Sequence, residues 1–174
     1  MSTTLVLGGA RSGKSAWVLR AAEAEAARCG VRPTMIVTAQ AFDDEMEDRI
    51  VRHRLERGAA WRTRETPLDL AGALDSLTRD DVAVVDCLTL WLTNVTLGEG
   101  EVEPSVAALR AAVARCPARL WLVSNEVGWG VVPDNALARR FRDEAGRLHQ
   151  ALAADAATVV LIVAGLPLGL KGAV

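Results

Sequence analysis

The chain has 174 residues, of which 51% are hydrophobic and 24% charged, and its 20 basic and 22 acidic side chains give a net charge of −2. This is an ordinary globular composition, which excludes a disordered, collagen-like or fibrous protein. The near-neutral charge argues against a general nucleic-acid-binding protein, which would usually be strongly basic. The three cysteines form no CxxC pair and no Cys/His cluster. They therefore favour free thiols in a reducing cytoplasm over disulfides or a zinc site.

No segment predicts export or membrane insertion. The N-terminus has no charged region or cleavage site before its first apolar run, so it is not typical of a signal peptide. The longest apolar stretch, residues 156–170, is short and contains two glycines and a proline, so we expect no membrane span. Without a linker or repeat, residues 1–174 are predicted to form one domain that buries roughly 70% of its unfolded surface.

Short apolar runs alternate with helical periodicities along the chain. The predicted strands are residues 3–7, 34–38, 82–85, 120–124 and 158–164. The predicted helices are residues 14–29, 43–58, 67–77, 106–116 and 136–154. The strands are continuous runs of Val, Ile and Leu, which is typical of parallel strands covered on both faces. The pattern predicts an α/β fold with a mostly parallel sheet flanked by helices.

A glycine-rich loop joins the first predicted strand to the first predicted helix. It consists of Gly8, Gly9, Ala10, Arg11, Ser12, Gly13, Lys14 and Ser15. It matches G-x-x-x-x-G-K-[ST] in the strand–loop–helix context of a phosphate-binding loop. Backbone N–H groups and the helix N-terminus would bind the phosphates. We expect Lys14 to act in catalysis on the β- and γ-phosphates and the Ser15 hydroxyl to ligate Mg²⁺. The alternative is a plain glycine turn.

The helix predicted at residues 43–58 carries His53 among Arg49, Arg52, Arg54 and Arg57. A neutral imidazole is a sensible nucleophile toward phosphorus. The arginines would favour the neutral ring and attract phosphates. The alternative is a solvated arginine-rich helix with an incidental histidine, because such charge runs usually form a wet face.

The apolar run at residues 82–85 ends at Asp86. This carboxylate could hold Mg²⁺ directly or through water, as a Walker-B aspartate does. The alternative is an aspartate that caps the next helix. Together with the loop, Asp86 predicts a nucleoside triphosphate and magnesium, and leaves kinase, ATPase and motor open.

The segment at residues 125–133 follows a predicted strand, at the edge where ligands bind in open α/β sheets. Asn125 and Glu126 could contact a substrate, and Glu126 could take a proton from an attacking hydroxyl. The alternative is loop architecture, in which two glycines form turns and Pro133 opens the next helix.

Three further side chains carry weaker expectations. His149 lies one position from the inner face of the last predicted helix, so we expect a structural or surface residue. Most of the five tryptophans are expected in the core. Trp91 and Trp129 are expected to be the most exposed.

Several segments beyond the loop match one family. They are Thr38-Ala39-Gln40, Asp43-Asp44-Glu45-Met46, Arg49-Ile50-Val51-Arg52-His53-Arg54, Asp86-Cys87-Leu88-Thr89 and Asn125-Glu126-Val127-Gly128-Trp129-Gly130. With the glycine-rich loop, they resemble the bifunctional adenosylcobinamide kinase / adenosylcobinamide-phosphate guanylyltransferase family of cobalamin biosynthesis, over essentially the whole chain. The resemblance implies a P-loop NTPase-like (RecA-like) fold.

The resemblance also implies two reactions. First, ATP or GTP phosphorylates the aminopropanol hydroxyl of adenosylcobinamide. Then GMP from GTP is carried on His53 and passed to adenosylcobinamide phosphate, which gives adenosylcobinamide-GDP. The resemblance further implies a homotrimer. It also implies nucleotide contacts from Val37, Thr38, Ala39, Arg54, Leu55, Glu56, Arg57, Glu65 and Asp86.

Two rival functions remain open at this point. One is a P-loop kinase that acts on another small alcohol without the histidine step. The other is a non-catalytic nucleotide-binding switch.

Overall fold

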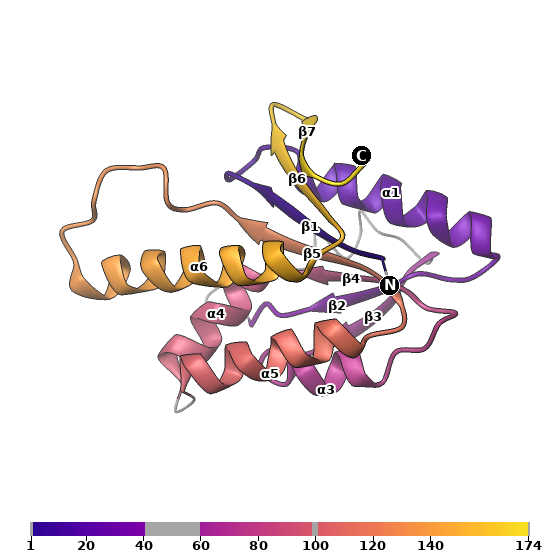
Figure 1. Cartoon of the computed structure of the whole chain (residues 1–174), viewed down its shortest axis with the longest axis horizontal. Helices are drawn as coiled ribbons and strands as arrows, with labels where there is room; N and C mark the ends of the chain where they lie inside the picture. The colour runs from indigo at the N-terminus through magenta and orange to yellow at the C-terminus, as the bar shows by residue number, and fades with distance from the viewer. Residues whose placement is uncertain (1, 41–59, 99–100, 174) are drawn as a thin grey trace.

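The computed structural model describes residues 2–40, 60–98 and 101–173 (Figure 1). The strands are β1 (Ser2–Gly8), β2 (Thr34–Val37), β3 (Arg62–Glu65), β4 (Val82–Asp86), β5 (Arg119–Asn125), β6 (Thr158–Val163) and β7 (Leu166–Lys171). The helices are α1 (Lys14–Cys29), α3 (Leu70–Asp75), α4 (Leu88–Leu97), α5 (Val102–Arg115) and α6 (Ala136–Asp155). The helix predicted at residues 43–58 lies outside the described residues.

The described strands form one sheet in the order β3-β2-β4-β5-β1-β6-β7. All neighbouring pairs are parallel except β6 with β7, which is antiparallel. Strand β5 therefore separates β1, which leads into the glycine-rich loop, from β4, which ends at Asp86. The predicted mostly parallel α/β fold is confirmed.

Helices cover both faces of the sheet, with α1 on one face and α3, α4, α5 and α6 on the other (Figure 1). Neighbouring residues of one strand pack against the helices on opposite faces of the sheet. In β1, Leu5 packs in the cluster with α3 to α6, whereas Val6 packs in the cluster with α1. Strand β4 divides in the same way between Val85 and Val84. Burial on both faces explains why these strands read as unbroken apolar runs.

Three elements have no prediction from the sequence. Strand β3 has the sequence Arg-Thr-Arg-Glu and all four residues are exposed, so only its pairing with β2 defines it. Helix α4 is apolar around most of its surface and rich in threonine, which obscures a helical period. Strand β7 contains a proline and a glycine, which is tolerated because it lies at the sheet edge.

Two helix boundaries also differ from the expectation. Helix α5 begins at Val102 rather than at residue 106, and Pro104 is accommodated in its first turn. Helix α3 is shorter than predicted and begins only after Asp69, whose side chain accepts from Gly72 N.

The prediction for the tryptophans is half right. Trp129 is 74% exposed, as expected. Trp91 is buried, and its indole N–H donates to the Leu68 carbonyl at 2.9 Å. The expectation of an exposed Trp91 is therefore wrong, because it lies on the α4 face that packs into the core.

Candidate functional site

The glycine-rich loop occupies the carboxyl end of β1, and α1 begins directly at Lys14. Inside the loop, Ser12 N donates to Gly9 O at 3.2 Å. A Cβ atom at Gly8 would lie 2.5 Å from Ser12 Oγ and 2.8 Å from the Ile162 carbonyl oxygen. Glycine is therefore needed where the loop folds back over the sheet edge.

The turn between β6 and β7 supports the loop from the side. This turn is formed by Ala164 (φ 52°) and Gly165 (φ 79°), as in a type I′ hairpin. Gly165 N donates to Ser12 O at 2.7 Å. Gly13 has φ 94°, and a Cβ atom there would lie 2.9 Å from Gly165 Cα. The loop is thus fixed by a contact about 150 residues away in sequence, which no local pattern indicates.

Replacing Gly13 by alanine is expected to destabilise the protein. The left-handed backbone costs an L-residue about 1–2 kcal/mol, which corresponds to a fall in Tm of about 2–8 °C for a domain of this size. Gly9→Ala is the control, because no atom lies within 4 Å of a Cβ there. Thermal denaturation without nucleotide measures both variants, and equal Tm values for them would contradict the expectation.

Lys14 lies across the loop that precedes it. Its side chain is buried, and Nζ donates to the Gly9 carbonyl at 3.0 Å. Ser15 follows in the first turn of α1 and is half-buried. The ammonium group therefore lies at the loop, where phosphate groups would be bound.

The ends of β3, β2 and β4 bring three more predicted residues into one row. Val37 is the register partner of Glu65 on one side and of Asp86 on the other. Thr38 joins the segment after β2 to the segment after β4. Its hydroxyl donates to Cys87 O at 2.7 Å and accepts from Cys87 N at 3.0 Å. Its amide and carbonyl are also bonded within the protein, to Asp86 O and Asn94 Nδ2. Thr38 and the following Ala39 thus continue the edge that Val37 begins.

Ser15 and Asp86 carry oxygen atoms that are suitable ligands for Mg²⁺. Carboxylate and hydroxyl oxygens are hard ligands, and Mg²⁺ bound with a nucleotide takes only one or two protein ligands beside phosphates and water. Within residues 2–40, 60–98 and 101–173, no group of three or more His, Cys, Asp or Glu side chains could hold a metal. The chemistry of these two donors therefore fits a nucleotide-borne Mg²⁺.

The end of β5 lies beside the loop. Asn125 is the register partner of Gly8, and Glu126 N donates to Gly8 O at 3.0 Å. The Glu126 carboxylate is oriented by Gly128 N, which donates to Oε1 at 2.7 Å. Asn125 N donates to Thr89 Oγ1 at 2.7 Å. Both predicted substrate residues therefore lie next to the glycine-rich loop.

A buried histidine, His149, lies next to the Glu126 side chain. His149 of α6 is 6% exposed, and its Nε2 lies 2.8 Å from Ser124 Oγ. Its Nδ1 lies 3.5 Å from Glu126 Oε2. Burial lowers the pKa of His149 more than the neighbouring Glu126 carboxylate raises it, so the ring is neutral at pH 7. The expected structural role holds, but its connection to the site was missed, because only the fold brings α6 to the end of β5.

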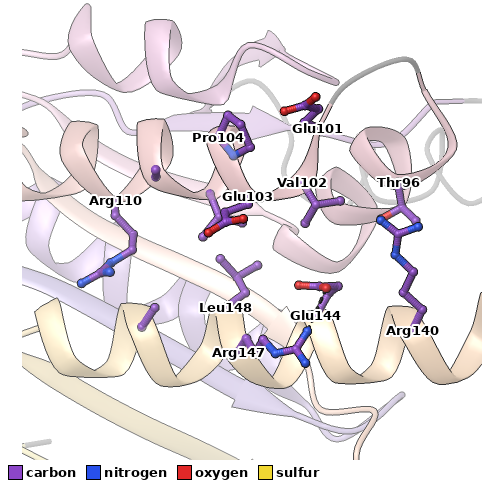
Figure 2. Close-up of a pocket in the computed structure, with 13 residues that line it drawn as sticks. Thr96, Glu101, Val102, Glu103, Pro104, Arg110, Arg140, Glu144, Arg147 and Leu148 are labelled. Atoms are coloured by element: carbon purple, nitrogen blue, oxygen red, sulfur yellow. Dashed lines mark hydrogen bonds and ion pairs between the residues drawn. The ribbon is translucent and has the colours of Figure 1, made fainter.

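Two cavities lie near α6. One, of about 460 Å³, lies beside the loop after β5 and has an apolar lining that includes Val127, Leu137 and Phe141. The other, of about 930 Å³, lies between α5 and α6 (Figure 2). In the second cavity Arg147 points to Glu144 at 2.8 Å, and no residue predicted for the site lines it. The first cavity is the closer of the two to the predicted substrate residues in the chain, because its lining residue Val127 directly follows Glu126.

The structure thus brings together the glycine-rich loop, Val37 to Ala39, Glu65, Asp86, Asn125 and Glu126 at one sheet edge. His53, Arg54, Leu55, Glu56 and Arg57 lie outside the described residues. In the described part of the chain, no helix is both long and apolar enough to span a bilayer.

Known proteins with similar sequences share one description. A family model for cobinamide kinase / cobinamide phosphate guanyltransferase matches residues 4–170. The bifunctional adenosylcobalamin biosynthesis protein CobP of Pseudomonas aeruginosa is 50% identical over 171 residues, which are 97% of this chain and 96% of that protein. The bifunctional adenosylcobalamin biosynthesis protein CobU of Salmonella typhimurium is 43% identical over 186 residues, covering 96% of this chain and 98% of that protein.

A solved structure agrees in fold. The flagellar accessory protein FlaH of Methanocaldococcus jannaschii superposes with a TM-score of 0.54 at 12% identity, covering 98% of this chain and 78% of that one. Identity this low is informative about the fold alone. Together with the sheet order, it confirms the predicted P-loop NTPase-like (RecA-like) fold.

Proposed function

The chain belongs to the cobinamide kinase / cobinamide phosphate guanyltransferase family, and from this premise we propose that it catalyses both reactions on adenosylcobinamide. It phosphorylates the aminopropanol hydroxyl with ATP or GTP, and it then transfers GMP from GTP to the resulting phosphate. The observation that carries the proposal is the glycine-rich loop with Lys14 at the carboxyl edge of the sheet, beside Asp86 and Glu126.

In the kinase reaction, the backbone of Gly8 to Gly13 and the N-terminus of α1 bind the nucleotide phosphates. Lys14 stabilises the charge on the transferring γ-phosphoryl group. Bound Mg²⁺, held by Ser15 and by Asp86 directly or through water, would neutralise further phosphate charge. Glu126, one residue beyond β5 and bonded through its amide to Gly8, takes the proton from the attacking hydroxyl.

In the transferase reaction, His53 attacks the α-phosphorus of GTP and pyrophosphate leaves. The phosphate of adenosylcobinamide phosphate then attacks the GMP–histidine and gives adenosylcobinamide-GDP. Covalent capture divides one difficult displacement into two. Support for His53 comes from the family and from the surrounding Arg49, Arg52, Arg54 and Arg57 in the sequence.

The remaining nucleotide contacts are assigned by their neighbourhood. Val37, Thr38, Ala39 and Glu65 lie on the same sheet edge as Asp86. Arg54, Leu55, Glu56 and Arg57 follow His53 in the sequence, so a GMP group on that histidine would lie close to them.

The apolar cavity of about 460 Å³ beside Val127 suits one apolar edge of the corrinoid, which is larger than the cavity. Its lining residue Val127 directly follows Glu126 in the chain, so a substrate lying there could extend its aminopropanol arm toward Glu126. Trp129, Val131 and Leu137 add exposed apolar surface on the same loop and helix start, which fits an amphipathic macrocycle.

The proposal includes residues 1–174 as one catalytic domain, a homotrimer as the assembly and the cytoplasm as the location. The trimer rests on the family resemblance. The cytoplasm is supported by three free cysteines, of which Cys87 and Cys116 are buried.

A stoichiometric assay tests the kinase half. We expect ADP to form from ATP and Mg²⁺ only when adenosylcobinamide is present, with one phosphorylated corrinoid for each ADP. ADP release without corrinoid phosphorylation would identify an ATPase instead. Nucleotide binding without any turnover would identify a switch.

A further inference from the structure

A chain of polar groups, half-buried at Thr89 and buried at Ser124 and His149, links α4, β5 and α6 next to Glu126. Thr89 Oγ1 lies 3.1 Å from Ser124 Oγ, and Ser124 Oγ lies 2.8 Å from His149 Nε2. On the other side of the ring, Nδ1 is buried, has no hydrogen-bond partner and faces Glu126 Oε2 at 3.5 Å. A buried polar atom without a partner is costly in a folded protein, so this nitrogen calls for an explanation.

One set of hydrogen-bond directions places the ring proton of His149 on the side of Glu126. Asn125 N can only donate, so Thr89 Oγ1 accepts from it. The Thr89 hydroxyl can then donate to Ser124, and the Ser124 hydroxyl to His149 Nε2. A neutral histidine that accepts at Nε2 carries its proton on Nδ1. That proton would lie on the side of the ring where Glu126 Oε2 is 3.5 Å from Nδ1.

We propose that His149 is a positioning residue for Glu126 in the kinase reaction, acting through an Nδ1–H directed at Oε2. This inference rests on the proposed function. The Glu126 carboxylate then has both oxygens oriented, with Gly128 N on Oε1 at 2.7 Å and the histidine facing Oε2. With the Glu126 side chain only 18% exposed, these two donors replace much of the water that would otherwise solvate the carboxylate.

The two contacts would orient the Glu126 carboxylate for the proton transfer that the reaction needs. As the substrate hydroxyl attacks the γ-phosphorus, its proton passes to a Glu126 oxygen and the bond from the γ-phosphorus to the bridging oxygen breaks. The nucleoside diphosphate leaves, and the Glu126 proton is later released to solvent. His149 keeps its proton throughout. Helix α4 carries no charged side chain that could compete with Glu126 for the ring.

Two substitutions of His149 separate the contact to Glu126 from the contact to Ser124. The amide nitrogen of an asparagine reaches the place of Nδ1, so His149→Asn keeps a donor toward Glu126. The longer amide of a glutamine reaches the place of Nε2, so His149→Gln keeps only the contact to Ser124. Glu126→Gln removes the base itself.

The readouts are kcat and KM for adenosylcobinamide phosphorylation, with guanylylation of the protein by GTP as an internal reference. Attack of a histidine on the α-phosphorus takes no proton from a substrate hydroxyl. We expect Glu126→Gln to lower the kinase kcat about 10²–10³-fold. His149→Gln should lower it about 10–100-fold and His149→Asn about threefold or less, each with little change in the KM for nucleotide.

Several results would overturn the inference. These are equal kcat values for His149→Asn and His149→Gln, or equal losses of phosphorylation and guanylylation in either variant. If His149→Gln does not fold, Ser124→Ala takes its place: loss of the group that fixes the tautomer should lower the kinase kcat about three- to tenfold, and an unchanged kcat would overturn the inference. A wild-type protein that forms no phosphorylated corrinoid would instead overturn the proposed function.

Discussion

Lys14→Ala is expected to lower both the phosphorylation of adenosylcobinamide and the guanylylation of the protein by about 10³-fold or more. Lys14 Nζ lies over the glycine-rich loop, bonded to Gly9 O at 3.0 Å. Its ammonium group would stabilise the negative charge on the phosphoryl group that is transferred. Losing a single preorganised donor of this kind costs about 10²–10³ in rate, and here the lost donor also carries a full charge. Steady-state rates of both half-reactions provide the measurement.

The other lysine of the chain is a matched control. Lys171 Nζ donates to the carbonyls of Ala153 and Ala154 near the end of α6, so Lys171→Ala should cost a little stability and leave turnover unaffected. Catalysis by Lys14→Ala within about tenfold of the wild type would contradict the role of Lys14, since one donor is worth at least about 10²-fold.

His53→Ala is expected to abolish guanylyl transfer while phosphorylation of adenosylcobinamide continues. The substitution removes the nucleophile that carries GMP and leaves the glycine-rich loop unchanged. After incubation with α-labelled GTP, the wild-type protein should carry an acid-labile, alkali-stable label that His53→Ala lacks. Equal loss of both activities would indicate a shared structural role instead.

The second histidine is the control for this experiment. His149 is buried, and its Nε2 lies 2.8 Å from Ser124 Oγ, so its ring is not available to a nucleotide. His149→Asn should therefore still become labelled by GTP. Label retained in His53→Ala and lost in His149→Asn would contradict the assignment of the nucleophile.

Local sequence patterns predicted those parts of the candidate site whose residues are close together in the chain. The glycine-rich loop could be predicted because its residues are consecutive and lie between a strand and a helix. Asp86 and Glu126 could be placed because the carboxyl ends of parallel strands share one edge. The order of the strands, which brings β5 between β1 and β4, followed from no local pattern.

Contacts between distant segments account for what the sequence analysis missed. Gly165, in the β6–β7 turn, donates its N–H to Ser12 O in the loop. The sequence of residues 8–15 does not predict that contact. His149 lies within one position of the predicted inner face of its helix, and only the packing of α6 brings it to Glu126. Strand β3 is polar and all four of its residues are exposed, so no hydrophobic pattern in the sequence indicates its backbone pairing with β2.

The identity of the final corrinoid product tests the central claim most directly. The wild-type protein is incubated with adenosylcobinamide, ATP, GTP and Mg²⁺, and the corrinoids are separated and identified by mass spectrometry. We predict adenosylcobinamide-GDP, with adenosylcobinamide phosphate as its precursor in the time course. Accumulation of adenosylcobinamide phosphate alone would contradict the transferase reaction, and recovery of unchanged adenosylcobinamide would contradict both activities.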